Sequence, residues 1–343
     1  MKSSKSKDKI LWAVVSAVIL VSSVYADTHQ HVQSVDEDGR GDHPDLGTLN
    51  KVTVEGVIIN RPDFMGGASA NQDAPYGPGA WWQMYIQGEG SDHAATAVWM
   101  GQCYDNIPGG SGTYTNEEWL NELYRLSHDP CTGYEFAPGD RVKVTGLLKF
   151  YNGKTNINER HDTDPELDFT VELIEPAVGL PQPEVITLDD VKDGNDKFIF
   201  DPSRQTGCEY YQGRLVKIKD VSFVDADSWG PDAEMLITDG NKTFPLKLGT
   251  GWGIYAGSNN LVEPFDVVGI FDQEGGDWKG DYRIWVLNYD GNGEVLTDRG
   301  HARYNLPGEI NRDGRVDFAD FAWFAEHWLE CVPGSGGCLE GGK

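Results

Sequence analysis

The stretch Gly139–Thr155, G-D-R-V-K-V-T-G-L-L-K-F-Y-N-G-K-T, decides the fold of this chain. Within Arg141–Tyr151, apolar side chains recur with a period of two residues, which predicts a β-strand with one buried face. These positions are Val142, Val144, Leu148 and Phe150. Asn152-Gly153 follows at once and is typical of the tight turn between two antiparallel strands. The stretch therefore predicts a long strand that reverses direction.

The segments around this stretch predict the rest of a small β-domain. Alternating apolar residues predict four further strands. They cover Lys51–Ile58, Trp81–Gln87, Ala97–Gln102 and Phe169–Leu173. Thr115–Leu126 predicts the helix of this half, because Thr115 can cap it and Glu118 completes a capping box. Three strands, a helix and two strands are the layout of a five-stranded OB barrel.

Gly139–Thr155 also resembles the bacterial OB-type modules in which a G-D-x-V-x-V-x-G segment precedes an N-G-x-T hairpin. The second half of the chain echoes the first in two short patterns. Val52-x-Val54-x-Gly56-Val57 matches Val216-x-Ile218-x-Asp220-Val221, and Val144-x-Gly146-Leu147 matches Val267-x-Gly269-Ile270. We therefore expect a mainly β fold of two OB-like five-stranded barrels in tandem, with a small C-terminal segment of a calcium loop and a helix. The alternative is one larger β-sandwich across both halves.

The composition shifts along the chain predict six segments. They are a signal peptide at 1–26, a disordered acidic lead-in at 27–50, the first barrel at 51–176, a linker at 177–184, the second barrel at 185–298 and a calcium-binding tail at 299–343. Lysines precede the apolar run Ile10–Val24, which is too short for a comfortable membrane span. We expect cleavage before Asp27 and a secreted or surface-attached bacterial protein without a stable membrane span. An uncleaved N-terminal anchor is the alternative.

The net charge limits the classes of partner that this chain can bind. The chain has 28 Lys and Arg against 55 Asp and Glu, a formal net charge of −27. Such a chain repels phosphate backbones instead of releasing counterions from them. It can also collect divalent cations. We therefore do not expect nucleic acid as the main partner. Asp36, Asp38 and Asp42 could hold a weak Ca²⁺, although a solvated linker explains them as well.

Export makes disulfides plausible for the five cysteines. Cys103 and Cys131 fall in one predicted domain, and their pairing would stabilise it by roughly 3 kcal/mol. Cys331 and Cys338 flank a glycine-rich loop and could pair locally. Cys208 is left over, and no neighbour in the sequence activates it as a nucleophile.

The tail contains the sequence E-I-N-R-D-G-R-V-D-F-A-D at Glu309–Asp320. Oxygen-bearing side chains stand at loop positions 1, 3, 5, 9 and 12, and Gly314 at position 6 permits a tight turn. The predicted Ca²⁺ ligands are Glu309, Asn311, Asp313, the carbonyl of Arg315, Asp317 and Asp320. Apolar residues at helical spacing follow and predict an amphipathic helix. The alternative is an acidic turn before an ordinary helix.

This loop and helix resemble the dockerin type I repeat, a half EF-hand. The resemblance covers about two dozen residues and implies calcium-dependent docking to a cohesin-like receptor or another extracellular protein. It implies docking contacts at Phe318, Ala319 and Phe321. The family normally has Asp at the position of Glu309 and carries two repeats, whereas one repeat is visible here.

Aromatic residues on the predicted strands are candidates for ligand binding, because OB folds take ligands across strands 2 and 3 and the adjoining loops. The candidates are Trp81, Tyr85, Trp99, Tyr151, Trp252, Trp278 and Trp285. Aromatic faces with few cations suit glycans or peptides better than phosphates. The alternative is that these residues cover the edges of the core.

The common nucleophile-elbow, zinc-protease and phosphate-loop motifs are absent from the sequence. Arg160-His161-Asp162 reads as an exposed structural segment. Enzymatic activity is left open, and we lean against it. We expect a secreted, non-catalytic binding or scaffold protein, tethered through its calcium-loaded tail, with barrels that bind glycan or protein. The alternatives are an enzyme or accessory subunit of extracellular polysaccharide degradation, and a secreted OB-fold protein that binds nucleic acid or accompanies a nuclease.

Overall fold

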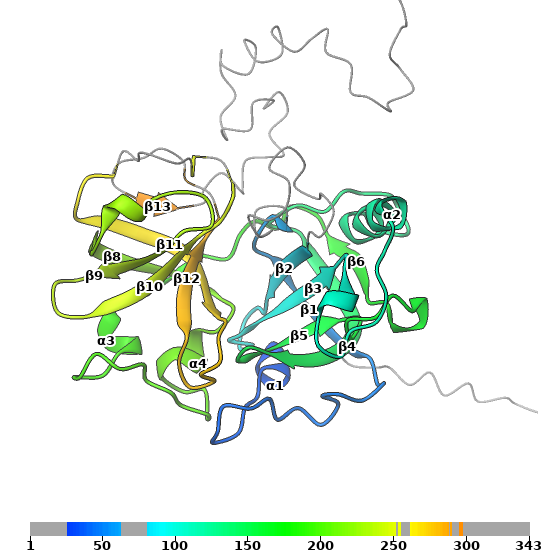
Figure 1. Ribbon diagram of the computed structural model, residues 1–343, viewed down its shortest axis with the longest axis horizontal. Helices are drawn as coiled ribbons and strands as arrows, with labels where there is room; N and C mark the ends of the chain where they lie inside the picture. The colour runs from blue at the N-terminus through cyan, green and yellow to red at the C-terminus, as the bar shows by residue number, and fades with distance from the viewer. Residues whose placement is uncertain are drawn as a thin grey trace, which may run out of the picture.

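The structure is a computed structural model that describes residues 26–62, 81–251, 253–254, 261–287, 289 and 295–297, the last three as backbone only. Two β-barrels lie side by side (Figure 1). In the described part of the chain, no helix is long and apolar enough to cross a membrane.

The first barrel has the strand order of an OB fold. Its five strands are β1 Val52–Ile58, β2 Trp81–Gln87, β3 Ala95–Gly101, β4 Arg141–Tyr151 and β5 Lys154–Asn158. They are hydrogen-bonded in the order β1-β2-β3-β5-β4, and the pairing of β4 with β1 closes the barrel. β3 and β5 are parallel, as the OB topology requires. β6, Thr170–Glu175, adds a strand outside the barrel, on β4.

The second barrel repeats this order. Its strands are β8 Leu215–Phe223, β9 Glu234–Thr238, β10 Thr243–Leu248, β11 Phe265–Gln273 and β12 Tyr282–Val286. The order β8-β9-β10-β12-β11 closes through β11 and β8, and β10 runs parallel to β12. β7, Glu184–Ile186, pairs with β8, and β13, Val295–Thr297, pairs with β11. Two closed five-stranded barrels in tandem confirm the mainly β, OB-like part of the predicted fold and exclude one continuous sandwich, whereas the predicted calcium loop and helix lie outside the described residues.

The two sequence echoes fall on equivalent strands. Gly146 of β4 and Gly269 of β11 occupy the same place, where a neighbouring strand crosses closely. A Cβ on Gly146 would lie 2.5 Å from Ile157 Cγ2, and one on Gly269 would lie 2.7 Å from Ile284 Cγ2. Asp220, which echoes Gly56, has a φ of 54° beside an irregular register in β8 and β11. Gly146 and Gly269 therefore serve the same close approach twice, whereas Asp220 differs from Gly56, which has no positive φ.

The helix of the first half is confirmed. α2 covers Asn116–Ser127, and Thr115 and Glu118 form the expected capping box. The fifth strand of the first barrel was placed wrongly. The strand that closes the barrel is β5, directly after the Asn152-Gly153 turn, whereas the predicted Phe169–Leu173 strand is the added β6. β5 escapes a periodicity search because both of its faces are buried and most of its side chains are polar.

The lead-in at 27–50 is ordered, contrary to the prediction of disorder. α1, His29–Val32, packs near β3, and Asp27 forms a β-bridge with Val54. Val32 is fully buried, and the Gln33 side chain bonds to the carbonyl of Thr155 at 2.7 Å. Few apolar residues suffice here because buried polar side chains find partners on the barrel. In Figure 1 the dark blue lead-in runs beneath the first barrel, and α1 lies near the seam between the barrels.

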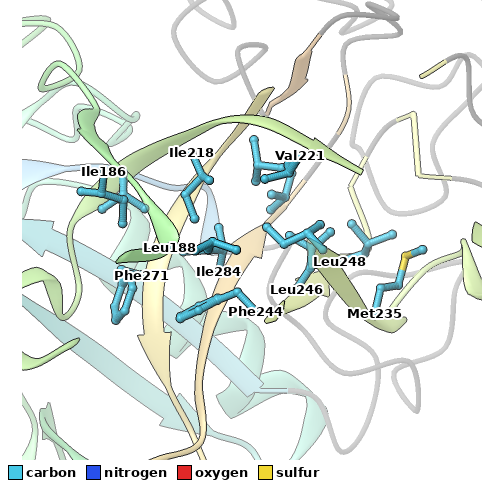
Figure 2. Close-up of a cluster of buried hydrophobic side chains, with 14 of the residues drawn as sticks. Ile186, Leu188, Ile218, Val221, Met235, Phe244, Leu246, Leu248, Phe271 and Ile284 are labelled. Atoms are coloured by element: carbon cyan, nitrogen blue, oxygen red, sulfur yellow. The ribbon is translucent and has the colours of Figure 1, made fainter. Parts of the chain in front are cut away.

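Each barrel has its own apolar core. In the first, Trp82, Met84, Val98 and Leu148 pack with the buried face of α2. In the second, Ile218, Phe244, Leu246, Phe271 and Ile284 point toward one another from four strands, as Figure 2 shows. Short helices lie between the strands. They are η2 Tyr104–Asn106, η3 Pro165–Leu167, α3 Leu188–Val191, α4 Gly207–Tyr211 and η4 Ala226–Ser228.

The predicted pairing of Cys103 with Cys131 is wrong, since both are free thiols in the structure. Cys103 lies two residues beyond β3, before α2, and Cys131 follows α2. Cys103 is half-buried, whereas Cys131 is exposed. Cys208 is also free and fully buried, and its thiol donates to the carbonyl of Val191. Cys331 and Cys338 lie outside the described residues.

Candidate functional site

The outer face of β2 and β3, where OB folds bind their ligands, is covered by the second barrel. Tyr85 of β2 is 1% exposed, and Trp285 of β12 is 3% exposed. The ring of Trp81 lies 6.1 Å from that of Trp285. The apolar seam is completed by Ile59, Ala97, Leu215, Ile270 and Leu287. The prediction that Trp81, Tyr85 and Trp285 face an external ligand is corrected: these residues join the two barrels.

A buried group of charges lies in the same contact. The Asp272 carboxylate accepts from Lys154 Nζ at 2.6 Å, from Arg283 Nε at 2.9 Å and from the Tyr85 hydroxyl. Burial raises the pKa of Asp272, but Lys154 and Arg283 outweigh burial and hold that pKa below its ordinary value. Since Lys154 belongs to β5 and Asp272 to β11, one ion pair links the barrels.

An open cavity of about 450 Å³ lies on the first barrel, and none of its wall residues belongs to the apolar seam. Its walls come from the lead-in, from the end of β4 and from the segment after β5. The apolar wall residues are Leu46, Leu49, Leu148, Phe150 and Leu167. The charged wall residues are Lys149, Arg160 and Asp162. We call this site the Lys149–Arg160 cavity.

The two cations of the cavity have no carboxylate partner within the described residues. Lys149 Nζ instead donates to His161 Nδ1 at 3.0 Å. Arg160 Nη1 donates to the carbonyls of Gly47 and Thr48, at 2.9 and 3.1 Å. Burial and, second, the nearby Arg160 charge lower the pKa of Lys149. An added anion would relieve this repulsion, so the cavity suits a negatively charged group.

The backbone at the cavity is strained. Arg160 and His161 are consecutive non-glycine residues with φ of 59° and 60°, in the left-handed region. Each such residue costs roughly 1–2 kcal/mol. The Arg160 amide donates to Asn158 Oδ1 at 2.6 Å, and the Ser111 amide donates to the His161 carbonyl at 2.9 Å. The left-handed backbone places Arg160 at the cavity wall and His161 against Lys149.

A buried acid supports the cavity from within the barrel. Glu159 is fully buried, and Tyr104 and Tyr114 donate their hydroxyls to its Oε1. Burial raises the pKa of Glu159 to about 8, although the two hydroxyls oppose the shift. Burial, with Lys149, lowers the pKa of His161 to about 4. At neutral pH the support behind the two cations therefore carries a protonated acid and a neutral imidazole.

The remaining aromatic candidates divide by position. Trp99 is half-buried, with its ring 5.0 Å from that of His161. Tyr151 is 44% exposed, and its ring lies edge-on to His161 at 6.1 Å. Both therefore belong to the surroundings of the cavity. Trp278 is half-buried against Phe150 and beneath the Arg40 guanidinium, and Trp252 lies outside the described residues.

The tail residues predicted to bind Ca²⁺ or a docking partner, all within 309–321, also lie outside the described residues. In the lead-in, Asp36 accepts from the amides of Asp38 and Arg40 and so closes a turn. Within the described ranges, the acids and histidines that could hold a metal come together at Asp27, His31 and His43.

Sequence reasoning did not single out Glu159, and it interpreted His161 as part of an exposed segment. Their burial depends on the lead-in and on the loop before α2, which are remote in sequence. One signal was present: Asn156, Asn158 and Glu159 form a polar run directly after a predicted turn, where a barrel strand was needed. Such a run in a strand of a closed barrel indicates buried polar residues with specific partners.

Comparisons with known proteins leave the family open. No protein-family model and no curated protein matches the chain. Among solved structures, a murine DNA-binding protein bound to double-stranded DNA aligns at 9% identity and a TM-score of 0.29, covering 68% of this chain and 93% of that chain. A replication protein A heterotrimer bound to single-stranded DNA aligns at 10% identity and a TM-score of 0.23, covering 58% of this chain and 39% of that chain. Likeness at this level carries no inference about what this chain binds.

Proposed function

We propose that this protein is a non-catalytic binding protein whose Lys149–Arg160 cavity takes an acidic saccharide unit. The observation that carries the proposal is that Lys149 and Arg160, at one open cavity, have no carboxylate partner among the residues that the structure describes, in a chain of net charge −27. Most other cations of the body are paired with acids, as Lys143 is with Glu172 and Lys217 with Asp266. Two cations that line one cavity without a carboxylate partner in the described part of the chain therefore favour an incoming anion.

The walls favour a carboxylated ring over a bare anion. Leu148, Phe150 and Leu167 offer apolar surface to the C–H faces of a sugar ring. Asp162 offers a carboxylate that accepts from hydroxyl groups, a role that a phosphate or sulfate ligand would not use. The exposed Tyr151 ring adds a flat surface nearby. One uronic-acid residue matches this mixture of two cations, one acceptor and an apolar wall.

Single-stranded nucleic acid is the second candidate. The OB topology and the same two cations favour it, since a backbone phosphate could replace the carboxylate. The net charge of −27 opposes it, because a long polyanion meets the field of the whole protein, whereas one saccharide unit meets mainly the cavity. The outer face of β2 and β3 in the first barrel is also occupied by the second barrel.

The tail completes the proposal as a tether. We infer from Glu309–Asp320 that Ca²⁺ folds the tail and that the folded tail docks on a cohesin-like or other extracellular partner. Calorimetric titration should find one fewer Ca²⁺ in the double variant Asp313→Ala, Asp320→Ala. Unchanged stoichiometry would remove the calcium site, and with it the tether, without affecting the cavity.

Binding should be measured by calorimetry with an oligogalacturonate, a neutral galacto-oligosaccharide and a single-stranded oligonucleotide. We expect the oligogalacturonate alone to bind, with an affinity that falls as salt is added. Arg160→Ala and Lys149→Met should each weaken binding about 10- to 100-fold, as expected for the loss of one charge-assisted hydrogen bond.

Lys197→Ala is the matched control, since Lys197 is an exposed lysine far along the chain and outside the cavity. It should leave the affinity unchanged. Binding of the oligonucleotide with the same dependence on Arg160 would favour the second candidate. Equal binding of acidic and neutral saccharides, unaffected by both cavity variants, would sink the proposal for this site.

A further inference from the structure

We propose that Asp27, His31 and His43 bind a divalent transition metal of the Zn²⁺ class. One ligand atom from each residue lies within 4.8 Å of the others. His31 Nδ1 lies 2.8 Å from Asp27 Oδ1, and His43 Nε2 lies 2.9 Å from Asp27 Oδ2. The two imidazole rings are 4.4 Å apart between centroids. A carboxylate thus stands between two imidazoles that converge on it.

The separations fit a metal after a small adjustment. Zinc binds nitrogen and oxygen at about 2.0–2.2 Å, so ligands in a tetrahedral site lie about 3.3 Å apart. The two contacts to Asp27 would open by a few tenths of an ångström from hydrogen-bonding distance. His31, whose side chain is 50% exposed, can make the larger movement toward His43.

The donor set selects the class of metal. Two imidazoles and one carboxylate suit Zn²⁺, Co²⁺ and their neighbours, whereas Ca²⁺ prefers a shell of oxygens. Three protein ligands leave a fourth position, and the exposure of His31 opens it to solvent. The site therefore differs in chemistry from the oxygen-rich loop predicted for the tail.

Binding requires the imidazole protons to move. The Asp45 amide donates to His43 Nδ1 at 3.1 Å, so the proton of neutral His43 now sits on Nε2, toward Asp27. A metal on Nε2 shifts that proton to Nδ1, and the bond from the Asp45 amide must give way. The Asp45 carboxylate, which now accepts from Asn50, is the acceptor that can turn toward the Nδ1 proton. Asp45 is then a positioning residue for His43.

The protein scaffold already holds two of the three ligands. The Asp27 amide donates to the Thr53 carbonyl at 2.7 Å, which fixes the residue beside β1. The His43 side chain is 1% exposed. A metal here would join the two ends of the segment between His31 and His43, which contains the Asp36 turn, and would hold this segment against the barrel. Since the lead-in continues from His43 to the cavity wall at Leu46, the same clamp would steady that wall.

The test is a Co²⁺ titration of the untagged full chain in excess Ca²⁺, which fills any oxygen-rich loop. We expect one equivalent of Co²⁺ to give the visible absorption of a four- or five-coordinate site, without a thiolate charge-transfer band, and Zn²⁺ to displace it. His31→Ala should abolish the absorption, and this variant should fold because His31 is exposed. Asp45→Asn should weaken Co²⁺ binding about 10- to 100-fold.

His128→Ala is the control, because His128 stacks on Tyr124 at the end of α2 and has no place in the site. It should bind Co²⁺ as the unaltered chain does. The proposal fails if Co²⁺ gives no such absorption, or if His31→Ala retains it, which would place the metal elsewhere. A second readout is limited proteolysis of 27–50, which Zn²⁺ should slow in the unaltered chain but not in His31→Ala.

Discussion

Glu159 shows how a single side chain can make stability depend on pH. Its carboxyl is fully buried, its Oε1 accepts from two tyrosines, and its Oε2 has no partner within the described residues. A charged carboxylate would leave that second oxygen unsolvated, so the protonated form is preferred. The folded pKa is about 8, against an ordinary value of 4.5. A raised folded pKa means that the stabilisation is complete below pH 4.5 and is lost as the pH rises through 8.

Glu159→Gln should remove this dependence, because a neutral amide imitates the protonated acid. The free energy of unfolding of the unaltered chain should fall between pH 6.5 and 8.5 relative to the variant, by at most about 2 kcal/mol. His161 does not interfere in this window, because its lowered pKa of about 4 matters only below pH 6.5. Urea denaturation at several pH values measures the difference.

The control for this prediction is Glu166→Gln, which changes an exposed acid on the same segment. Its stability should run parallel to that of the unaltered chain across the window. If Glu159→Gln also ran parallel, Glu159 would be charged in the folded state. The conclusion that a protonated, neutral Glu159 lies behind Lys149 would then be wrong.

At the scale of the element, two glycines in equivalent strands give a second prediction. Gly146→Ala places a Cβ 2.5 Å from both Ile157 Cγ2 and Phe169 Cβ, and these atoms belong to the packed core. Overpacking of this kind costs about 1–3 kcal/mol. Gly269→Ala meets Ile284 Cγ2 and the Trp285 carbonyl, each at 2.7 Å, and should cost a similar amount. Thermal unfolding monitored by circular dichroism measures both.

Gly194→Ala separates this effect from the general change of glycine to alanine. A Cβ on Gly194 meets no atom within 4 Å, and its φ is not positive. This variant should be neutral or more stable by up to about 1 kcal/mol. Equal effects at Gly146 and Gly194 would contradict the argument that close strand crossing requires the repeated glycines.

The same elements show how far sequence carries the fold. Four of the five strands of the first barrel, β1 to β4, were predicted from apolar residues in their sequences, because one face of each contacts an apolar core. Thr115 and Glu118 predict the start of α2, because the hydrogen bonds of a capping box are local in the sequence. β5 has no such signal, since Lys154 is buried against Asp272 of the second barrel and Asn156 is buried although it is polar. The order of the lead-in could not be predicted for a similar reason, because its polar side chains form hydrogen bonds with residues that are remote in the sequence.

The candidate site could not be predicted from the sequence, because it forms where segments that are far apart in the chain meet. The Lys149–Arg160 cavity exists only where the lead-in, β4 and the segment after β5 meet. Tyr85 lies on the outer face of β2, where the sequence predicted a ligand, but Trp285 of the second barrel and its neighbours cover this face and remove Tyr85 from solvent. A strand pattern identifies a face and does not say what covers it.

For the whole molecule, we expect the buried seam to make the two barrels unfold together. Asp272 and Glu274 contact the same two cations, Lys154 and Arg283, but the Asp272 side chain is 0% exposed and that of Glu274 is 35% exposed. This pair of acids therefore forms a built-in comparison. Asp272→Ala leaves two buried cations without their main counter-charge, which costs about 3–5 kcal/mol. Glu274→Ala removes a solvated partner and should cost at most about 1 kcal/mol.

Urea denaturation should measure how much stability Asp272→Ala loses and whether the loss affects both barrels. Trp82 and Trp119 report on the first barrel and Trp229 on the second, since all three are buried in their own cores. If the seam couples the barrels, the unaltered chain unfolds in one transition, and Asp272→Ala shifts that whole transition because it weakens the contact that both barrels share. Two separate transitions, of which Asp272→Ala moves only one, would show that the barrels are independent. The covered face of β2 and β3 would then open without unfolding, and Tyr85 would again be available to a ligand.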